Sequence, residues 1–395
     1  MKGVYINFIL IFDLFLILGC KQTKVNDNLF ITVDIMDTPS FKKELILQDI
    51  MDVEYIPLET NDIFINQGLV QSIGENIILV KNRNDDGDIF VYDRAGRALR
   101  KINRKGQSGE EYSYIFGIVL DEYNHEMYIN SHLDRKILVY DLYGNFKRSF
   151  KQKEGTGYFF YTDVFDYDRT QLICNNQYSK EIGFILISKQ DGSITKEIRI
   201  PFSKKKLLFQ LLENKVDNSL ISIQPGPYST IIPYNEDWIL LELSSDTVYS
   251  FSPECNLHPF LVRTPPIQSM VPENFLILRL ISDRYYFMET IKNVWDFSEN
   301  EGFSRTFLMY DKQEKEFFKY NVYNGDYLIK KEVYMNTFRI VNNQNELCCP
   351  LEASELVDAY KKGLLKGKLK EIAATLNEES NPVIMLIKHK SKHII

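Results

Sequence analysis

The most constraining feature of the chain is a repeat with a period of 48 residues. Three apolar segments are each followed by a glycine: residues 89–93 by Gly96, residues 137–141 by Gly144, and residues 184–188 by Gly192. A period of roughly 40 to 50 residues made of short strands and turns is typical of a β-propeller blade. Because a single blade cannot bury its apolar faces, the copies must stack side by side around a central channel. The repeat therefore predicts an all-β ring of blades.

Six blades can be laid out along the chain from runs of β-favouring residues broken by Gly, Asn and Asp, which are hairpin signals. The predicted strands of the first two blades lie at 77–80, 89–93, 98–102, 115–120, 127–130, 137–141 and 146–150. The third blade spans about 163–200, and strands of the later blades lie at 238–243, 246–251, 276–281, 285–290, 307–311, 316–320, 337–341, 346–347 and 383–387. The strict period fails across residues 201–227, which we interpret as an elaborated loop between blades.

A C-terminal helical insertion interrupts the sixth blade. Over about 352–377, apolar residues recur at three- and four-residue steps, which indicates one apolar helix face. Gly363 and Gly367 each weaken such a helix by roughly 1 kcal/mol relative to Ala. We therefore expect the helix to depend on docking against the propeller.

An early strand at residues 53–58 has no blade of its own. The simplest arrangement is that this N-terminal strand closes the last blade by pairing beside residues 383–387. The ring would then leave no sheet edge open.

Residues 1–20 are typical of a signal sequence, with Lys2 before an apolar run that is too short for a spanning helix. The run ends in Ile-Leu-Gly-Cys at Cys20, which resembles the bacterial lipobox and predicts lipidation of Cys20. Two acyl chains would hold the protein firmly at a membrane, since each buried methylene contributes about 0.8 kcal/mol. Asp13 interrupts the run and Leu18 is bulky for its position, so an uncleaved anchor or an ordinary secretory signal stays open. Residues 21–50 then form a tether and lead-in, and residues 51–395 form the propeller.

Composition excludes some partners. The chain is 44% hydrophobic with 24 Tyr and 26 Phe, enough for a large core, and it has a net charge of -7. Scattered Lys and Arg without a basic stripe argue against nucleic acid. After Cys20 the cysteines do not form a disulfide framework; they are Cys174, Cys255, Cys348 and Cys349. The adjacent Cys348 and Cys349 are interpreted as small apolar strand residues, with a redox or metal pair as the alternative.

Four features together resemble a known family. They are the lipobox Cys20, Tyr-Ile-Pro-Leu-Glu-Thr at 55–60, Gly-Gln-Ser-Gly-Glu-Glu-Tyr at 106–112 and Asn-Pro-Val at 381–383. This combination is similar to the six-bladed β-propeller lipoproteins of Bacteroidetes, whose fold is similar to that of NHL-repeat propellers. The resemblance implies an outer-membrane lipoprotein of the cell envelope, with motifs that are structural and not catalytic. Many surface-exposed members carry an acidic tract after the cysteine, and residues 21–24 lack one, which favours a periplasmic-facing protein over a surface-exposed one.

Propeller geometry indicates where a ligand would bind. Loops from the second to the third strand and loops between blades emerge on one face, around the channel mouth. The candidate ligand-binding residues on this rim are Arg104, Glu111, Tyr112, His132, Arg135, Tyr158, Tyr161 and Tyr178. Tyr side chains contribute large contact area at small entropic cost, which suits a peptide or glycan. The alternative is that each Tyr packs between neighbouring blades.

A second candidate is a calcium loop at residues 82–93. Asn82, Asn84, Asp86 and Asp93 follow the spacing of calcium ligands around a glycine. The first ligand is Asn where Asp is usual, and the loop lies between strands and not between helices. Asn, Asp and Gly are also the residues of a hairpin turn. Calcium is therefore the one cofactor left open, and the turn is the simpler interpretation.

No motif commits the chain to catalysis. His132 is alone near the rim, whereas metal-dependent propeller lyases and lactonases need several converging ligands. Inner-strand acids such as Asp163 could act in general acid-base catalysis. No nucleophile elbow, phosphate loop or dinucleotide fingerprint occurs. We expect a membrane-anchored, non-catalytic, monomeric propeller that binds a peptide, glycan or partner protein; the alternative is a metal-dependent hydrolase or lyase acting on an envelope metabolite.

Overall fold

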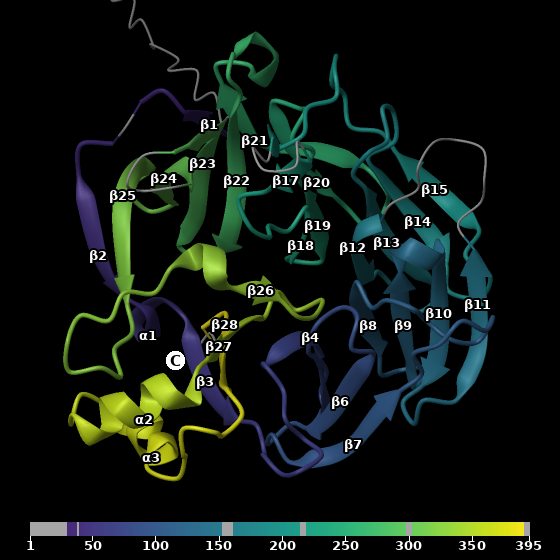
Figure 1. Cartoon of the computed structure of the whole chain (residues 1–395). Coiled ribbons are helices and arrows are strands. Elements are labelled where there is room, and N and C mark those ends of the chain that lie inside the picture. Colours follow the sequence, from purple (N-terminus) through teal and green to yellow (C-terminus); the bar gives the residue numbers. More distant parts are fainter. Residues whose placement is uncertain (1–29, 38, 152–160, 214–218, 298–301, 391–395) are drawn as a thin grey trace, which may run out of the picture.

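The strands form six blades arranged in a ring around a central axis (Figure 1). The structure is a computed structural model that describes residues 30–37, 39–151, 161–213, 219–297 and 302–390. The predicted fold class, an all-β six-bladed β-propeller, is confirmed. The signal sequence at 1–20, including Cys20, lies outside the described residues.

Each blade is an antiparallel sheet whose first strand lies nearest the axis. The first blade contains β4 (Leu69–Ile73), β5 (Ile77–Lys81), β6 (Asp88–Asp93) and β7 (Ala98–Asn103). The second contains β8 (Gly117–Asp121), β9 (Glu126–Ser131), β10 (Lys136–Asp141) and β11 (Phe146–Lys151). The third contains β12 (Tyr161–Asp166), β13 (Gln171–Asn176), β14 (Phe184–Ser188) and β15 (Ile194–Ile198).

The later blades are less regular. The fourth contains β18 (Ile231–Tyr234), β19 (Asp237–Leu240), β20 (Thr247–Phe251) and β21 (Leu257–Thr264). The fifth contains β22 (Asn274–Ile281), β23 (Tyr285–Asp296), β24 (Gly302–Asp311) and β25 (Glu316–Tyr323). The sixth contains β26 (Arg339–Ile340), β27 (Leu347–Leu351), β28 (Val383–Lys388) and β3 (Asp52–Pro57). Short one-turn elements complete the chain: α1 (Leu47–Ile50), η1 (His132–Asp134), η2 (Ile267–Ser269) and η3 (Met335–Thr337).

Two strands lie within the segment predicted as a tether and lead-in, residues 21–50. β1 (Ile31–Asp34) pairs in parallel with β21, and β2 (Lys42–Ile46) pairs in parallel with β25. Both are outer fifth strands with alternating or exposed side chains. Because they cover existing sheet edges and add little to the core, their sequences carry no strong apolar signal.

The ring closes as predicted. β3 pairs antiparallel with β28, with Val53 opposite Ile387 and Pro57 opposite Val383. The buried side chain of Asn381 reinforces the closure, because its Nδ2 donates to the carbonyls of Glu59 and Phe64 at 2.8 Å each. The Asn-Pro-Val motif is therefore part of the ring closure.

The repeating glycines mark the contact between successive blades. Gly96, Gly144 and Gly192 lie in the turns between the third and fourth strands, all with φ between +71° and +86°. A Cβ on Gly96 would lie 2.1 Å from the carbonyl oxygen of Pro57, and a Cβ on Gly144 would lie 2.6 Å from Ile102. Each of these turns meets the outermost strand of the preceding blade, so only glycine fits both the backbone and the space. Gly96 meets β3, which therefore acts as the outer strand of the blade before the first.

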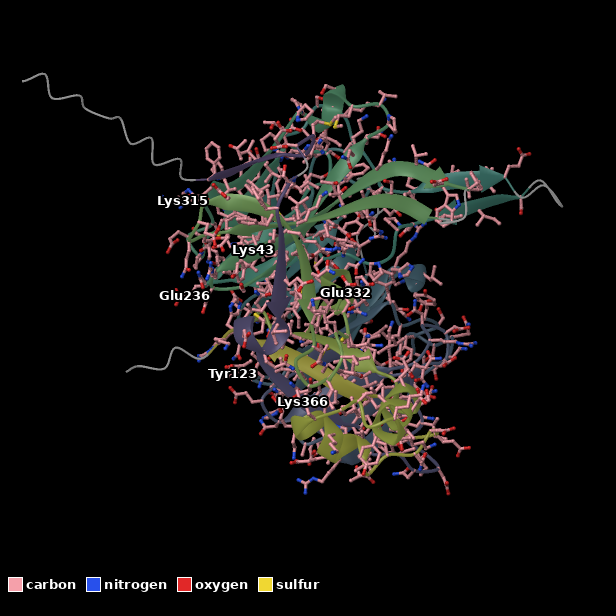
Figure 2. The ribbon with its side chains drawn as sticks, turned by 90° about the vertical axis from the view of Figure 1, so that its left-hand side faces the viewer. Lys43, Tyr123, Glu236, Lys315, Glu332 and Lys366 are labelled. Carbon is pink, nitrogen blue, oxygen red and sulfur yellow. The ribbon has the colours of Figure 1, made fainter. Side chains whose placement is uncertain are left out.

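Two hairpins project from one face of the ring. We call this the upper face; it carries the turns between second and third strands and the connections between blades, and the lower face carries the turns between first and second and between third and fourth strands. β16 (Gln210–Glu213) and β17 (Leu220–Ile223) form the first hairpin, within the segment predicted as a loop at 201–227. The long strands β23 and β24 form the second. In Figure 2 the projecting strands extend to the right, away from the turn residues Tyr123, Glu236 and Lys315 on the left.

The predicted helix at 352–377 is two helices, α2 (Ala353–Lys361) and α3 (Gly367–Ala373). The chain breaks between them because Gly363 and Gly367 adopt φ of +67° and +57°, values outside a right-handed helix. Buried Leu356 and Leu369 dock the pair against the core, as expected for helices too short to be stable alone.

Candidate functional site

The axis of the ring contains a cavity of about 410 Å³. Its wall is built from the first strands of four blades, β4, β8, β12 and β26, and continues at the lower face into the turns at 74–75, 122–123 and 342–344. The volume lies within the roughly 300–1,000 Å³ typical of small-molecule sites. We call this space the channel.

Asp163 places a carboxylate in the channel from β12. Its Oδ2 accepts hydrogen bonds from the backbone N and the Oγ1 of Thr230, both at 2.6 Å. Burial raises the pKa of Asp163, although the Thr230 bonds and the charge of Arg339 act in the opposite direction. The side chain still has accessible surface. Its other oxygen has no hydrogen-bond partner among the described residues, so one oxygen is fixed and one is available.

Arg339 places a cation in the same channel from β26. Its side chain is exposed to the channel, and within the described ranges its guanidinium forms no hydrogen bond or ion pair. A guanidinium has five N–H donors and commonly pairs with a carboxylate or phosphate. Arg339 is therefore prepared to bind an anion without breaking an existing contact.

Two buried amides complete the wall. Gln71 on β4 is 6% exposed and Asn130 on β9 is 4% exposed. Their nitrogens donate to the carbonyls of Leu69 and Tyr161 at 3.0 and 2.8 Å, which fixes the orientation of each amide. Their oxygens, Oε1 and Oδ1, have no partner among the described residues. Since an unsatisfied buried acceptor costs about 1–3 kcal/mol, an N–H or O–H brought to this wall would recover part of that free energy.

Gly117 keeps the channel open in front of Asn130. It is the first residue of β8 and lies opposite Asn130 in the strand register. A Cβ at Gly117 would meet no atom within 4 Å, and its φ is not in the left-handed region. A larger side chain could therefore be accommodated there, and it would occupy space in the channel.

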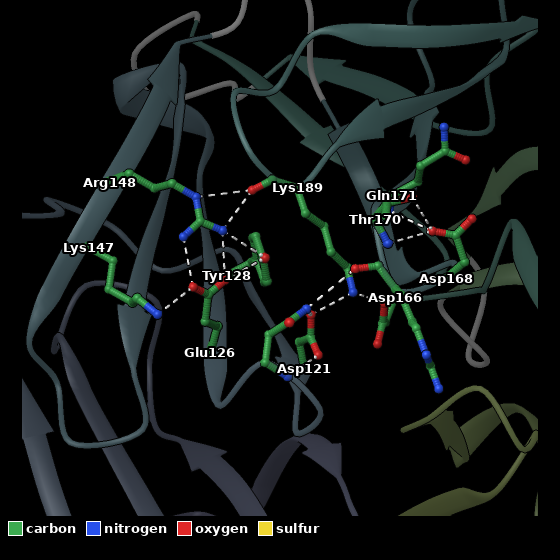
Figure 3. A network of polar contacts seen from close by, with 12 residues as sticks. Asp121, Glu126, Tyr128, Lys147, Arg148, Asp166, Asp168, Thr170, Gln171 and Lys189 are labelled. Carbon is green, nitrogen blue, oxygen red and sulfur yellow. Dashed lines mark hydrogen bonds and ion pairs between the residues drawn. The ribbon is translucent and has the colours of Figure 1, made fainter.

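Several charged groups at the lower mouth already have partners. Lys189 lies between Asp121 and Asp166, with its Nζ 2.6 and 2.5 Å from their oxygens (Figure 3). Glu122 accepts hydrogen bonds from the backbone nitrogens of residues 75–77. These groups hold blades together. Asp163 and Arg339, in contrast, have hydrogen-bonding atoms without a partner among the described residues.

The structure buries several predicted rim residues. Tyr112 is fully buried, with its hydroxyl donating to the Gly87 carbonyl at 2.8 Å, and Tyr161 is 4% exposed. Both pack between blades, which is the alternative to ligand binding given above, because an aromatic ring fills the wedge-shaped space between two sheets. Tyr178 is 42% exposed, and Tyr158 lies outside the described residues.

The remaining rim candidates are spread over the upper face. Arg104 is exposed, and its Nε donates to the Gly144 carbonyl at 2.9 Å. Glu111 accepts from the backbone nitrogen of Ser108 at 2.9 Å, and Arg135 is exposed at a left-handed position. His132 is buried with its ring edge-on to Phe116 at 4.5 Å, and burial lowers its pKa. None of these four residues lines the channel.

The four calcium candidates do not come together. Asn82 and Asn84 lie at the upper end of the first blade, where Asn84 accepts from Lys81 at 2.5 Å. Asp93 lies at the other end of β6 and pairs with Arg97 at 2.6 Å. Asp86 lies in the turn before β6 and accepts from the backbone of Arg83 at 3.4 Å. No group of three or more His, Cys, Asp or Glu in the described part of the chain could hold a metal ion.

Gln71, Asn130 and Arg339 were not predicted from the sequence. For Asn130 and Arg339 the signal that could have found them is a polar residue inside a predicted strand, whereas Gln71 lies in β4, where no strand was predicted. Asn130 follows an apolar run in β9, and Arg339 precedes Ile340 in β26. Asp163 was singled out by this kind of position.

Fold and channel define the class: a six-bladed β-propeller with a polar axial cavity. The model of the family described as "Domain of unknown function (DUF4934)" matches residues 30–388, and the chain belongs to this family. A search of curated proteins found no match.

One solved structure supports the fold, and a second is a weaker match. A protein of Bacteroides fragilis NCTC 9343 described as exported is 15% identical, with a TM-score of 0.59, and the alignment covers 89% of this chain and 99% of that one. A member of the DUF4221 family from Bacteroides vulgatus ATCC 8482 is 10% identical, with a TM-score of 0.49 and coverage of 86% and 97%. At these identities the first similarity establishes the fold alone.

Substitution of Asp163 should separate its charge from its hydrogen bonds. Asp163→Asn keeps an oxygen that accepts from Thr230. It also removes a carboxylate that is unfavourable when charged, because burial raises its pKa. We therefore expect the melting temperature of this variant at pH 7.5 to be higher than that of wild type by roughly 2 °C. Asp163→Ala leaves the Thr230 nitrogen unsatisfied and should be less stable than wild type. Thermal unfolding by circular dichroism checks both.

The stability difference between Asp163→Asn and wild type should depend on pH in a definite direction. A carboxyl with a raised folded-state pKa contributes stability that is present at low pH and is lost as the pH rises through that value. The advantage of Asp163→Asn should therefore shrink near pH 4. An equal effect of the Asn and Ala variants would contradict this account.

Proposed function

We propose that the protein is a binding propeller of the cell envelope that takes the polar end of a peptide or glycan into its central channel. The observation that carries the proposal is the pair of Arg339 and Asp163, both with unused bonding capacity in the same cavity. Thr230 holds the Asp163 carboxylate in place before any ligand arrives. Little conformational entropy is then lost on binding.

Attachment to a membrane through Cys20 is part of this proposal, as is the kinship with NHL-repeat propellers. The relative from B. fragilis is described as exported, which agrees with an envelope location. Among the described residues, no helix is long and apolar enough to cross a bilayer. β1 runs parallel to β21 and so begins at the lower face, which would direct the upper face away from an anchor at Cys20.

Blocking the channel tests the proposal. Gly117→Leu should fill space in front of Asn130 without a clash, and Gly109→Leu is the matched control, because Gly109 also has open space but lies in an exposed loop outside the channel. Oligosaccharides and short peptides would be screened on an array, and hits measured by calorimetry. We expect Gly117→Leu to weaken at least one hit tenfold or more and Gly109→Leu to leave it unchanged.

Two results would count against the proposal. One is an array without any hit for the folded wild-type protein. The other is a set of hits that bind equally well to Gly117→Leu, which would move the site away from the channel.

A further inference from the structure

Arg339 is the one cation among the described lining residues of the channel that forms no ion pair or hydrogen bond. Among the described charged residues that line it, Asp166 pairs with Lys189, and Glu346 accepts from Asn342 at 2.8 Å. Arg94 lies 3.7 Å from Glu54 and from Glu346. Arg339 has no such partner. An accessible guanidinium on an inner strand favours a ligand with a carboxylate or another planar anion.

The rest of the wall offers acceptors. Asp163, Gln71 and Asn130 line the same cavity as Arg339; one oxygen of Asp163 has no hydrogen-bond partner among the described residues, and the amide oxygens of Gln71 and Asn130 are buried and unpartnered. Each of these oxygens needs an N–H or O–H from the ligand. A simple anion would satisfy Arg339 alone. A peptide carboxyl end brings few donors, whereas a sugar brings several hydroxyls on a small ring.

We propose that the channel binds an acidic sugar, either a free uronic acid or an oligosaccharide end that carries one. Its carboxylate pairs with Arg339, and its hydroxyls donate to Asp163, Gln71 and Asn130. This inference rests on the proposed function, because it names the ligand class for the same site. A cavity of about 410 Å³ is large enough for a small-molecule ligand of this kind.

The test compares matched sugars and matched variants. The probes are D-glucuronic and D-galacturonic acid, with D-glucose and D-galactose as neutral partners at equal ionic strength. Binding to the folded, full propeller is followed by saturation-transfer NMR and calorimetry. Arg339→Gln removes the charge, and Arg199→Gln is the control, since Arg199 is 64% exposed at the side chain and pairs with Glu197 far from the channel lining.

We expect an acidic sugar to bind wild type and Arg199→Gln alike and to bind Arg339→Gln at least tenfold more weakly. The neutral sugars should bind at least tenfold more weakly than the acids to wild type. Arg339→Gln should remain folded, because Arg339 forms no hydrogen bond or ion pair in the described structure and acts on the fold only through its charge near Asp163. Gly117→Leu should abolish the same signal.

Several outcomes would overturn the inference and leave the proposed function intact. Equal binding of neutral and acidic sugars is one, and displacement of the acid by an equal concentration of acetate is another. A third is Gly117-dependent binding of acetyl-trialanine in the absence of uronic acid binding. If no ligand depends on Gly117, the proposed function fails as well.

Discussion

Lys189→Met is expected to lower the free energy of unfolding by about 3–5 kcal/mol at pH 8, because it leaves buried carboxylates without their counter-charge. The side chains of Lys189 and Asp121 are 5% and 1% exposed, and the Nζ also contacts Asp166 (Figure 3). These three residues come from the second and third blades. Arg148 adds a bond from its Nη2 to the Lys189 carbonyl at 2.7 Å. Loss of the ammonium therefore weakens the contact between two blades.

The loss of unfolding free energy in Lys189→Met should depend on pH. Burial raises the pKa of Asp166 to about 6 even with the Lys189 charge nearby, which acts to lower it. A raised pKa means that the folded state binds the proton more tightly than the unfolded state, so stability from this group is lost as the pH rises through about 6. Without Lys189 the pKa of Asp166 rises further, and protonation then relieves the unpaired charge. Lys189→Met should be less destabilising at pH 5 than at pH 8.

Denaturant unfolding at the two pH values measures both effects. The control is Lys368→Met, which removes an exposed pair with Glu371 at 3.0 Å and should change stability by less than about 1 kcal/mol. If Lys189→Met lost as little unfolding free energy as the control, the buried ion pair would not be needed between these blades.

The architecture was predictable because inter-blade packing imposes a repeated constraint on the sequence. Gly96 and Gly144 recur since each must fit a left-handed turn against the preceding blade. The strands next to these turns are continuous apolar runs, because both sheet faces are buried. Where packing does not repeat, the sequence says less. The hairpin of β16 and β17 projects from the ring, with Leu220 67% exposed, and so no periodic burial pattern marks it.

The candidate site was less predictable than the fold. Tyr112 and Tyr161 have the composition of a binding surface, but their rings fill spaces between blades. Gln71 and Arg339 lie in strands from blades at opposite ends of the chain, and only ring closure brings them to one cavity. No local sequence pattern predicts that these two residues line the same cavity. The position of Asp163 within an inner strand was informative, because burying a carboxylate costs free energy and such a residue therefore indicates a specific role.

Ile56→Asp is expected to give the largest loss of stability, about 4–5 kcal/mol or more, because it places a charge in the joint that closes the ring. Ile56 on β3 is 2% exposed and belongs to one apolar cluster shared by the sixth and first blades. The cluster includes Ile384 from β28 and Phe90 from β6. A carboxylate there would be desolvated without a partner. β3 would then separate from β28, and both blades would lose an apolar face at once.

Leu99→Asp is the matched control, since Leu99 is 46% exposed on the outer strand β7. It should change stability by about 0.5 kcal/mol or less. Hydrogen exchange distinguishes two forms of failure in Ile56→Asp. If the ring is one cooperative unit, amides of the first and sixth blades lose protection together, because closure joins them through β3. Loss of protection confined to residues 52–57, with an unchanged unfolding midpoint, would mean that the ring holds without its closing strand.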